Sequence, residues 1–200
     1  MKKFLMLFTF LFVLSLPAYA QGDYPKFEAY GGYSYFSADI HIDDPFNNNG
    51  QPFFTQREGF HGAGFSFAGN LSRSFGVVAD FSYHKKGIDL FGPPNVDFST
   101  FAYLFGPRVT ARGHRVEAFA HALIGGVRRK VKDPTVDEVL VDDKDLALGF
   151  GGGVDIKATR NVAVRLLQVD YLPFRDRDPF TGDKQWRQNV RVGAGVTWRW

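Results

Sequence analysis

The sequence predicts an all-β protein, an eight-stranded antiparallel up-and-down transmembrane β-barrel with an N-terminal signal peptide. Three observations predict this fold. Apolar and polar residues alternate with period two in eight segments, long and short connections take turns along the chain, and the last segment ends on an aromatic residue. A barrel in lipid needs an apolar outer face, an even number of strands and no free edge, and these observations match that need.

The first twenty residues have the layout of a secretory signal peptide. A lysine pair supplies the positive start, residues 4–16 form an apolar core, and Ala18-Tyr19-Ala20 has small residues where cleavage would occur. The apolar run is shorter than the ~20 residues that a spanning helix needs, which disfavours a membrane anchor. We expect residues 1–20 to be removed and residues 21–200 to form one barrel domain.

The composition narrows the class. The chain has no cysteine, so it has no disulfide framework and no thiolate metal site. Its formal charge of +3 includes the two lysines of the signal peptide, which leaves the mature chain near +1 (+3 minus 2). No basic cluster beyond residues 128–130 would support nucleic-acid binding, so we do not expect the protein to bind nucleic acid. The 22 glycines and 16% aromatic residues suit a small barrel with aromatic belts at the lipid interfaces.

The first four predicted strands, residues 26–37, 59–69, 75–85 and 96–111, each have one apolar face. The residues on these faces are Phe27, Ala29, Tyr33 and Tyr35, then Ala63, Phe65 and Phe67, then Val77, Ala79, Phe81 and Tyr83, then Phe101, Tyr103 and Phe105. Successive side chains of a strand point to opposite faces, so these residues would all contact lipid.

The last four predicted strands are residues 116–128, 145–157, 161–172 and 189–200. Phe150, Val154 and Ile156 share a face in the sixth strand. The eighth strand alternates almost without error, and its apolar face consists of Val190, Val192, Ala194, Val196, Trp198 and Trp200. A terminal amphipathic strand of this length is what a transmembrane barrel needs in order to close.

The seventh predicted strand breaks the alternation. Val162 and Val164 have one parity, whereas Val169 and Tyr171 have the other. A one-residue bulge at Leu166-Leu167 would restore the register. It would also point the polar residues of this strand inward together, namely Arg165, Gln168 and Asp170.

The connections between the predicted strands alternate in length. The long ones are residues 38–58, 86–95, 129–144 and 173–186, and the short ones are residues 70–74, 112–115 and 158–160. Outer membrane barrels have short periplasmic turns and longer extracellular loops, whereas a soluble barrel has no reason to gather its long loops at one end. The long connections are therefore expected to face the outside of the cell.

Three short motifs and the aromatic terminus carry a family resemblance. The motifs are Gly106-Pro107-Arg108, Gly151-Gly152-Gly153-Val154-Asp155 and Gln168-Val169-Asp170-Tyr171. With them the chain resembles the OmpA/OmpX-like outer membrane β-barrel superfamily, which implies location in the cell outer membrane. The resemblance also implies contact with outer membrane lipids and lipopolysaccharide, and recognition by the barrel assembly machinery through Trp198 and Trp200. The last residue is tryptophan where the family usually has phenylalanine, and no peptidoglycan-binding domain follows, so no cell-wall tether is expected.

Eight strands enclose an interior that side chains can fill, so a wide channel is not expected. The predicted interior residues carry both signs of charge; they are Asp80, Asp155, Arg165, Asp170, Arg191 and Arg199, with Glu28, Arg108 and Glu117 as further members. Lone charges out of water are costly, so we expect these groups to pair. A network that stabilises the fold is favoured over a narrow ion pathway.

Two charged regions of the predicted loop end are candidate binding sites. Lys85, Lys86, Arg128, Arg129 and Lys130 stand where the third and fifth strands leave the membrane, and could pair with lipopolysaccharide phosphates or act only as solubilising charge. The loops also contain many oxygen ligands that suit Ca²⁺ or Mg²⁺, without the spacing of a calcium-binding loop. These are Asp39, Asp43, Asp44, Asn47, Asn48 and Asn49, then Asp133, Asp137, Glu138, Asp142, Asp143 and Asp145, then Asp176, Asp178 and Asp183. Solvated acidic loops are the favoured interpretation.

Three functional hypotheses follow. The first is a non-enzymatic outer membrane barrel that supports the envelope or presents loops to surface partners. The second is a secreted soluble barrel that binds a small ligand, and the third is a lipid-modifying enzyme. His61 and Ser66 have opposite parity, and Ser82 and His84 share a face without an evident third member of a triad. No catalytic residue, metal site or cofactor is therefore assigned.

Overall fold

The computed structural model describes residues 24–43, 52–88, 96–133, 138–177 and 184–200. The predicted signal peptide lies outside these residues. No helix in the described part of the chain has the length and apolar character needed to cross a membrane.

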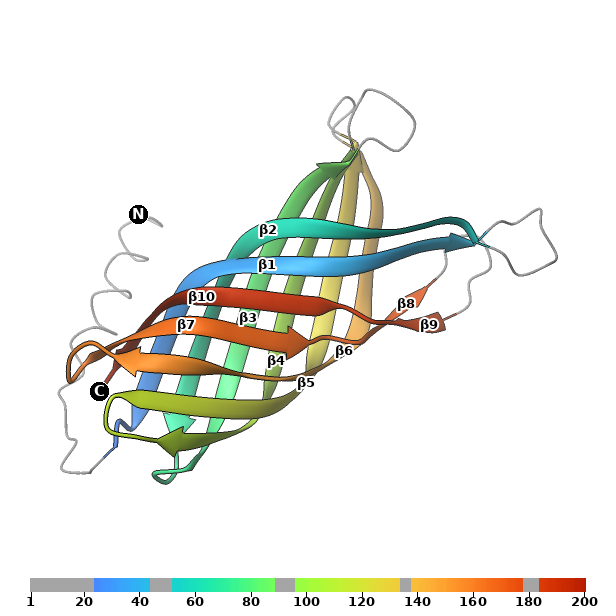
Figure 1. Cartoon of the computed structure of the whole chain (residues 1–200). Coiled ribbons are helices and arrows are strands. Elements are labelled where there is room, and N and C mark those ends of the chain that lie inside the picture. Colours follow the sequence, from blue (N-terminus) through green and yellow to red (C-terminus); the bar gives the residue numbers. More distant parts are fainter. Residues whose placement is uncertain (1–23, 44–51, 89–95, 134–137, 178–183) are drawn as a thin grey trace, which may run out of the picture.

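Within the described residues, eight long strands close into one antiparallel barrel (Figure 1). They are β1 (Phe27–Asp43), β2 (Pro52–Asn70), β3 (Phe75–Ile88), β4 (Val96–Arg112), β5 (Val116–Asp133), β6 (Glu138–Lys157), β7 (Val162–Tyr171) and β10 (Val190–Arg199). Each of β1–β6 pairs with the next along the chain, and β10 pairs with both β7 and β1. The last strand therefore closes the cylinder against the first, which confirms the predicted fold class.

The two ends of the barrel differ. We call the end with residues 71–74, 113–115 and 158–161 the turn end; the backbone of Lys26 and Phe27 bonds that of Trp200 there. We call the opposite end the loop end. It carries the connections after β1, β3, β5 and β7 (Figure 1). The segments predicted as short connections therefore lie at one end of the barrel, and those predicted as long connections lie at the other.

The strands extend further toward the loop end than the sequence pattern indicated. β1 continues to Asp43, β2 begins at Pro52, β5 continues to Asp133 and β6 begins at Glu138. The connection after β7 contains a further hairpin of β8 (Phe174–Arg177) and β9 (Lys184–Arg187). An apolar period marks a strand only where one face meets lipid or core, so a strand that continues beyond the membrane carries no such signal.

The bulge expected in the seventh strand is present. Gly193 and Gly195 of β10 lie opposite Gln168 and Arg165 of β7. Between these two pairs, the two leucines of β7 therefore lie opposite a single residue of β10. On the other side, the β6 ladder skips Leu166. Both leucines point outward, whereas Arg165, Gln168 and Asp170 are buried. The bulge thus places three polar groups in the interior without sending an apolar side chain there.

This arrangement predicts that deletion of Leu166 is tolerated. The shortened β7 would alternate regularly, with every remaining side chain on its present face. The matched control is deletion of Ala79 from the regular strand β3, which inverts the faces of one half of that strand and should prevent folding. Heat-modifiable gel migration in detergent would measure both. Failure of the Leu166 deletion to fold, beside a folded wild type, would contradict the expectation.

The outer surface of the barrel is apolar over its middle. Exposed large side chains stand on all eight strands, among them Tyr33, Phe65, Val77, Phe105, Ile124, Phe150, Val164 and Val196. Such a continuous apolar surface would be an aggregation liability in water. It therefore favours a membrane barrel over the soluble ligand-binding alternative.

Candidate functional site

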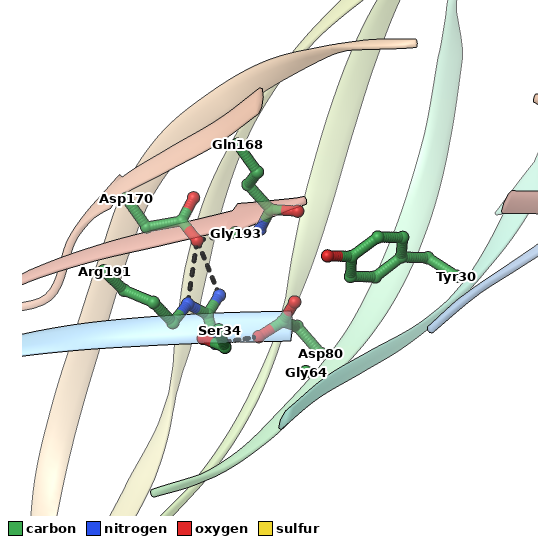
Figure 2. A pocket seen from close by; sticks show the side chains of 8 residues that line it. All are labelled: Tyr30, Ser34, Gly64, Asp80, Gln168, Asp170, Arg191 and Gly193. Carbon is green, nitrogen blue, oxygen red and sulfur yellow. Dashed lines mark hydrogen bonds and ion pairs between the residues drawn. The ribbon is translucent and has the colours of Figure 1, made fainter. Parts of the chain in front are cut away.

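The interior polar groups form one chain of contacts that begins at Arg191. This arginine on β10 lies 2.6 Å from Asp80 of β3 through Nη1 and 2.6 Å from Asp170 of β7 through Nη2. Nη1 also donates a hydrogen bond to Ser82 Oγ at 2.9 Å. Figure 2 shows this arginine between the two carboxylates. Three strands that are distant in sequence are therefore joined through one guanidinium.

Asp170 extends the contacts toward the middle of the barrel. Its carboxylate lies 2.8 Å from His121 Nε2 and accepts a hydrogen bond from Gln168 Nε2 at 2.8 Å. A cavity beside this group has room for about one water molecule. The residues that line it are Tyr30, Ser34, Gly64, Asp80, Gln168, Asp170, Arg191 and Gly193 (Figure 2). A void of this size is consistent with a filled barrel and not with a channel for solutes.

Arg165 occupies the next level. Its Nε and Nη2 donate to the two oxygens of Asp155 at 2.8 and 3.1 Å, and its Nη1 donates to the Gln168 side chain at 2.8 Å. The guanidinium carbon also lies 4.2 Å from the ring centre of Tyr30 and 4.3 Å from that of Phe119. Two hydrogen bonds to one carboxylate and two aromatic rings use the planar shape of arginine, which lysine lacks.

Two glutamates form ion pairs with the cations nearest the turn end. Glu28 of β1 lies 3.1 Å from Arg108 and 2.8 Å from Arg112, both on β4. Glu117 of β5 lies 2.9 Å from Arg112 and 2.8 Å from Arg199. Lys157 approaches the second oxygen of Glu117 at 2.8 Å. These contacts link strands on opposite walls of the barrel.

All nine predicted interior residues lie inside the barrel, and each is at most 4% exposed. Among the described residues, five buried carboxylates meet five arginines, since Arg112 joins the four predicted ones. The sequence analysis missed Arg112 because it ended the fourth strand at Ala111. The signal was there, since Arg112 has the parity of Arg108.

The interior is not polar throughout. Toward the loop end it is filled by a cluster of buried apolar side chains, including Phe36, Phe60, Leu104, Leu123, Val127, Leu172 and Phe174. Phe174 belongs to β8, where its backbone pairs with Ala147 of β6. Its ring stacks on that of Phe36, with the ring centres 6.5 Å apart. The β8–β9 hairpin thus supplies a ring that helps to close the interior. Sequence alternation could not show this, because the hairpin lies in a predicted loop.

The five basic residues predicted at the loop end, here called the basic rim, lie on both faces of the barrel wall. Lys85 lies outside, beyond Tyr83, and pairs with Asp97 at 2.8 Å, which raises the pKa of Lys85 above its ordinary value. Arg128 and Lys130 have the parity of the outward-facing Ile124. Lys86 and Arg129 turn inward, in correction of the expected rim. Their partners are Glu58 for Lys86, and Asp145 at 3.1 Å and the Phe174 ring at 5.4 Å for Arg129. Adjacent residues of a strand cannot share a face.

The two terminal tryptophans stand at the closing seam. Trp198 lies on the outer surface, opposite Ala29 of β1 and Val162 of β7. Trp200 packs near Phe27 and Phe67, with ring centres 6.3 and 6.2 Å apart. The last residue therefore contributes to an aromatic group that spans the join between the first and last strands.

The four candidate residues His61, Ser66, Ser82 and His84, all within the described part of the chain, do not assemble into a catalytic group. His84 is buried and its Nε2 lies 2.8 Å from Ser34 Oγ, whereas Ser82 is bonded to Arg191. His61 is outside, with Nδ1 at 2.5 Å from the Tyr33 hydroxyl, and Ser66 is inside. In the part of the chain that the structure describes, no group of three or more acidic or histidine side chains is placed to hold a metal ion. Of the acidic loop side chains, only those of Asp143 and Asp145 fall within it.

Comparison with known proteins agrees with this architecture. The model of the outer membrane protein β-barrel domain family matches residues 6–198. A search of curated proteins finds no significant match. Among solved structures, the Neisserial surface protein A is similar with a TM-score of 0.61 and 14% identity, over 90% of this chain and 100% of that one. The attachment invasion locus protein Ail of Yersinia pestis, in complex with the heparin analogue sucrose octasulfate, is similar with a TM-score of 0.54 and 14% identity, over 88% of this chain and 99% of that one. At such identity these two structures show a shared fold.

The closed antiparallel barrel, its apolar exterior and its filled interior thus agree with a family match that spans nearly the whole chain. The chain belongs to the outer membrane protein β-barrel family, and it is a protein of the cell outer membrane.

Proposed function

We propose that this chain is a non-enzymatic barrel that stabilises the outer leaflet by binding lipopolysaccharide phosphates at its loop end, with the long loops outside the cell. The observation that carries the proposal is the direct pairing of two outward cations, Arg128 of β5 and Lys144 of β6. Two cations directly opposite each other on neighbouring strands can act together on one anion, because guanidinium and ammonium groups both form charge-assisted bonds to phosphate.

The height of these cations supports a lipid headgroup as the anion. Arg128 also lies opposite Phe101, and the next outward side chains toward the membrane are those of the exposed Ile124 and Leu146. Lys130 stands further out on β5, opposite Ser99 of β4. The cations therefore follow the edge of the apolar band, where headgroups of a bilayer begin.

A lipid-modifying enzyme is not favoured. Ser82 and His84 both point into the filled interior, away from acyl chains, and each is bonded to a structural partner. Trp198 and Trp200 support the further proposal that the barrel assembly machinery recognises the last strand, because this strand closes the barrel.

The proposed site can be tested with a matched pair of variants, one that changes cations on the outer face of the barrel wall and one that changes cations on the inner face. The outward variant R128Q/K130Q/K144Q and the inward variant K86Q/R129Q would be folded in detergent and titrated with purified lipopolysaccharide at low salt. Each basic group near an anionic membrane is worth about 1 kcal/mol, so the outward variant should bind on the order of 100-fold more weakly. The inward variant should bind as the wild type does. Equal binding by all three proteins would refute the proposed site.

A further inference from the structure

Each short turn of the barrel carries one arginine. Arg73, Arg115 and Arg160 occupy the three turns, and all three side chains are exposed. Residues 71–74, 113–115 and 158–161 contain no aspartate or glutamate. The cations just inside the barrel have carboxylate partners, but no ion pair is found for these three arginines among the described residues. The surface of the turn end is therefore positive.

The apolar exterior continues to these turns. Leu71, two residues before Arg73, is 67% exposed, and Val116, next to Arg115, is 47% exposed. Ile156, four residues before Arg160, is 37% exposed. An exposed apolar side chain beside a cation is suited to a membrane interface, where the hydrocarbon meets the headgroups. The turns are thus placed at headgroup height and do not project far into water.

The aromatic residues of the same end mark this interface independently. Phe27, Phe67 and Trp200 form a group with ring centres 5.9 to 6.3 Å apart, and Trp198 stands on the outer surface beside them. Aromatic girdles of outer membrane barrels lie at the boundary between hydrocarbon and headgroups. Three arginines just beyond such a girdle would meet the phosphates of the adjoining leaflet.

We propose that Arg73, Arg115 and Arg160 form a phospholipid anchor that gathers anionic glycerophospholipids around the turn end. With the orientation of the proposed function, this is the inner leaflet of the outer membrane. Peptidoglycan is the less favoured occupant, because turns of three or four residues that continue apolar strands do not reach far from the bilayer. The anchor lies at the opposite end from the lipopolysaccharide site and shares no residue with it.

The chain contains its own reporter for this lipid shell. Trp198 is lipid-facing and lies opposite Val162, two residues after Arg160. Trp186 of β9 is exposed near the loop end and would confuse the signal, so the experiment uses a W186F background. The protein is folded into vesicles of dioleoylphosphatidylcholine that contain either brominated phosphatidylglycerol or brominated phosphatidylcholine. Trp198 and Trp200 then remain, both at the turn end, and quenching of their fluorescence gives the relative affinity of the two lipids for the surface there.

We expect phosphatidylglycerol to bind about fivefold more tightly than phosphatidylcholine, which corresponds to roughly one cation near an anionic lipid. The variant R73Q/R115Q/R160Q should lower this ratio to about 1. A matched variant that loses three cations at the loop end, R57Q/K85Q/K130Q, should keep it. Raising the salt to 0.5 M should also abolish the preference in the W186F protein that keeps all three arginines. This measurement does not depend on whether an arginine variant folds.

Three results would overturn the anchor: no preference for phosphatidylglycerol in the W186F protein, an undiminished preference in the folded arginine variant, or a preference that 0.5 M salt leaves unchanged. Arginine-dependent co-sedimentation with purified peptidoglycan, without a lipid preference, would also overturn it and assign the turns to the cell wall. The vesicles contain no lipopolysaccharide. Failure here is therefore distinct from failure of the proposed function.

Discussion

Replacement of Arg191 by methionine should destabilise the barrel by about 3–5 kcal/mol, because removal of one partner leaves buried charge uncompensated. Asp80 and Asp170 both rely on this guanidinium, with each carboxylate 2.6 Å from it. All three residues are at most 3% exposed. Methionine keeps much of the volume and removes the charge, so the loss reports electrostatics more than packing. Urea unfolding in zwitterionic vesicles, followed by gel migration, would measure it.

Two further variants separate charge from general disturbance. In R191M/D80N/D170N the buried carboxylates are neutral, and part of the lost stability should return, because the cost of unpaired charge is gone. Arg57→Met removes an exposed cation of β2 and should change the free energy of unfolding by less than about 0.5 kcal/mol. An R191M protein as stable as the wild type would show that the two carboxylates do not depend on Arg191.

Replacement of Glu117 by glutamine should cost a similar amount, about 3–5 kcal/mol. This carboxylate is the shared partner of Arg112, Arg199 and Lys157, with distances of 2.8 to 2.9 Å. Arg112 would keep Glu28, but no other carboxylate in the described part of the chain pairs with Arg199. Since Arg199 is on the closing strand, the variant should also unfold faster from the seam between β1 and β10.

The same measurement applies, with a control of identical chemistry. Glu58→Gln changes a carboxylate whose partner Lys86 is partly exposed at the loop end, so the expected loss is below about 1 kcal/mol. Equal losses for Glu117→Gln and Glu58→Gln would show that the convergence of three cations on one buried carboxylate has no special weight. A larger loss for Glu117 supports a network that holds opposite walls together.

The alternation of side chains was sufficient to predict much of the candidate site. Strand parity placed Asp80, Asp155 and Arg191 inside, and the parity break in β7 located a bulge that the ladders contain. The same rule applied to the rim would have separated Lys86 and Arg129 from their neighbours. The rim was instead assembled from sequence proximity, which groups residues on both faces of a wall.

Partners across the barrel could not be predicted. Arg199 and Glu117 are 82 residues apart, and Arg191 and Ser82 are 109 apart. Parity says that a side chain points inward, but the height at which it meets others depends on strand register and shear around the ring. The apolar filling near the loop end was also hidden, because Phe174 reaches the interior from a hairpin that the pattern assigned to a loop.

The sequence by itself determined the number of barrel strands, their outward faces, the alternation of turns and loops, and the sign of the nine interior charges that it predicted. These follow from local rules, since a period of two and a turn are properties of adjacent residues. Only the tertiary structure decided which charges pair and where polar filling gives way to apolar filling. Those features depend on closure of the barrel, which brings distant segments to a common height.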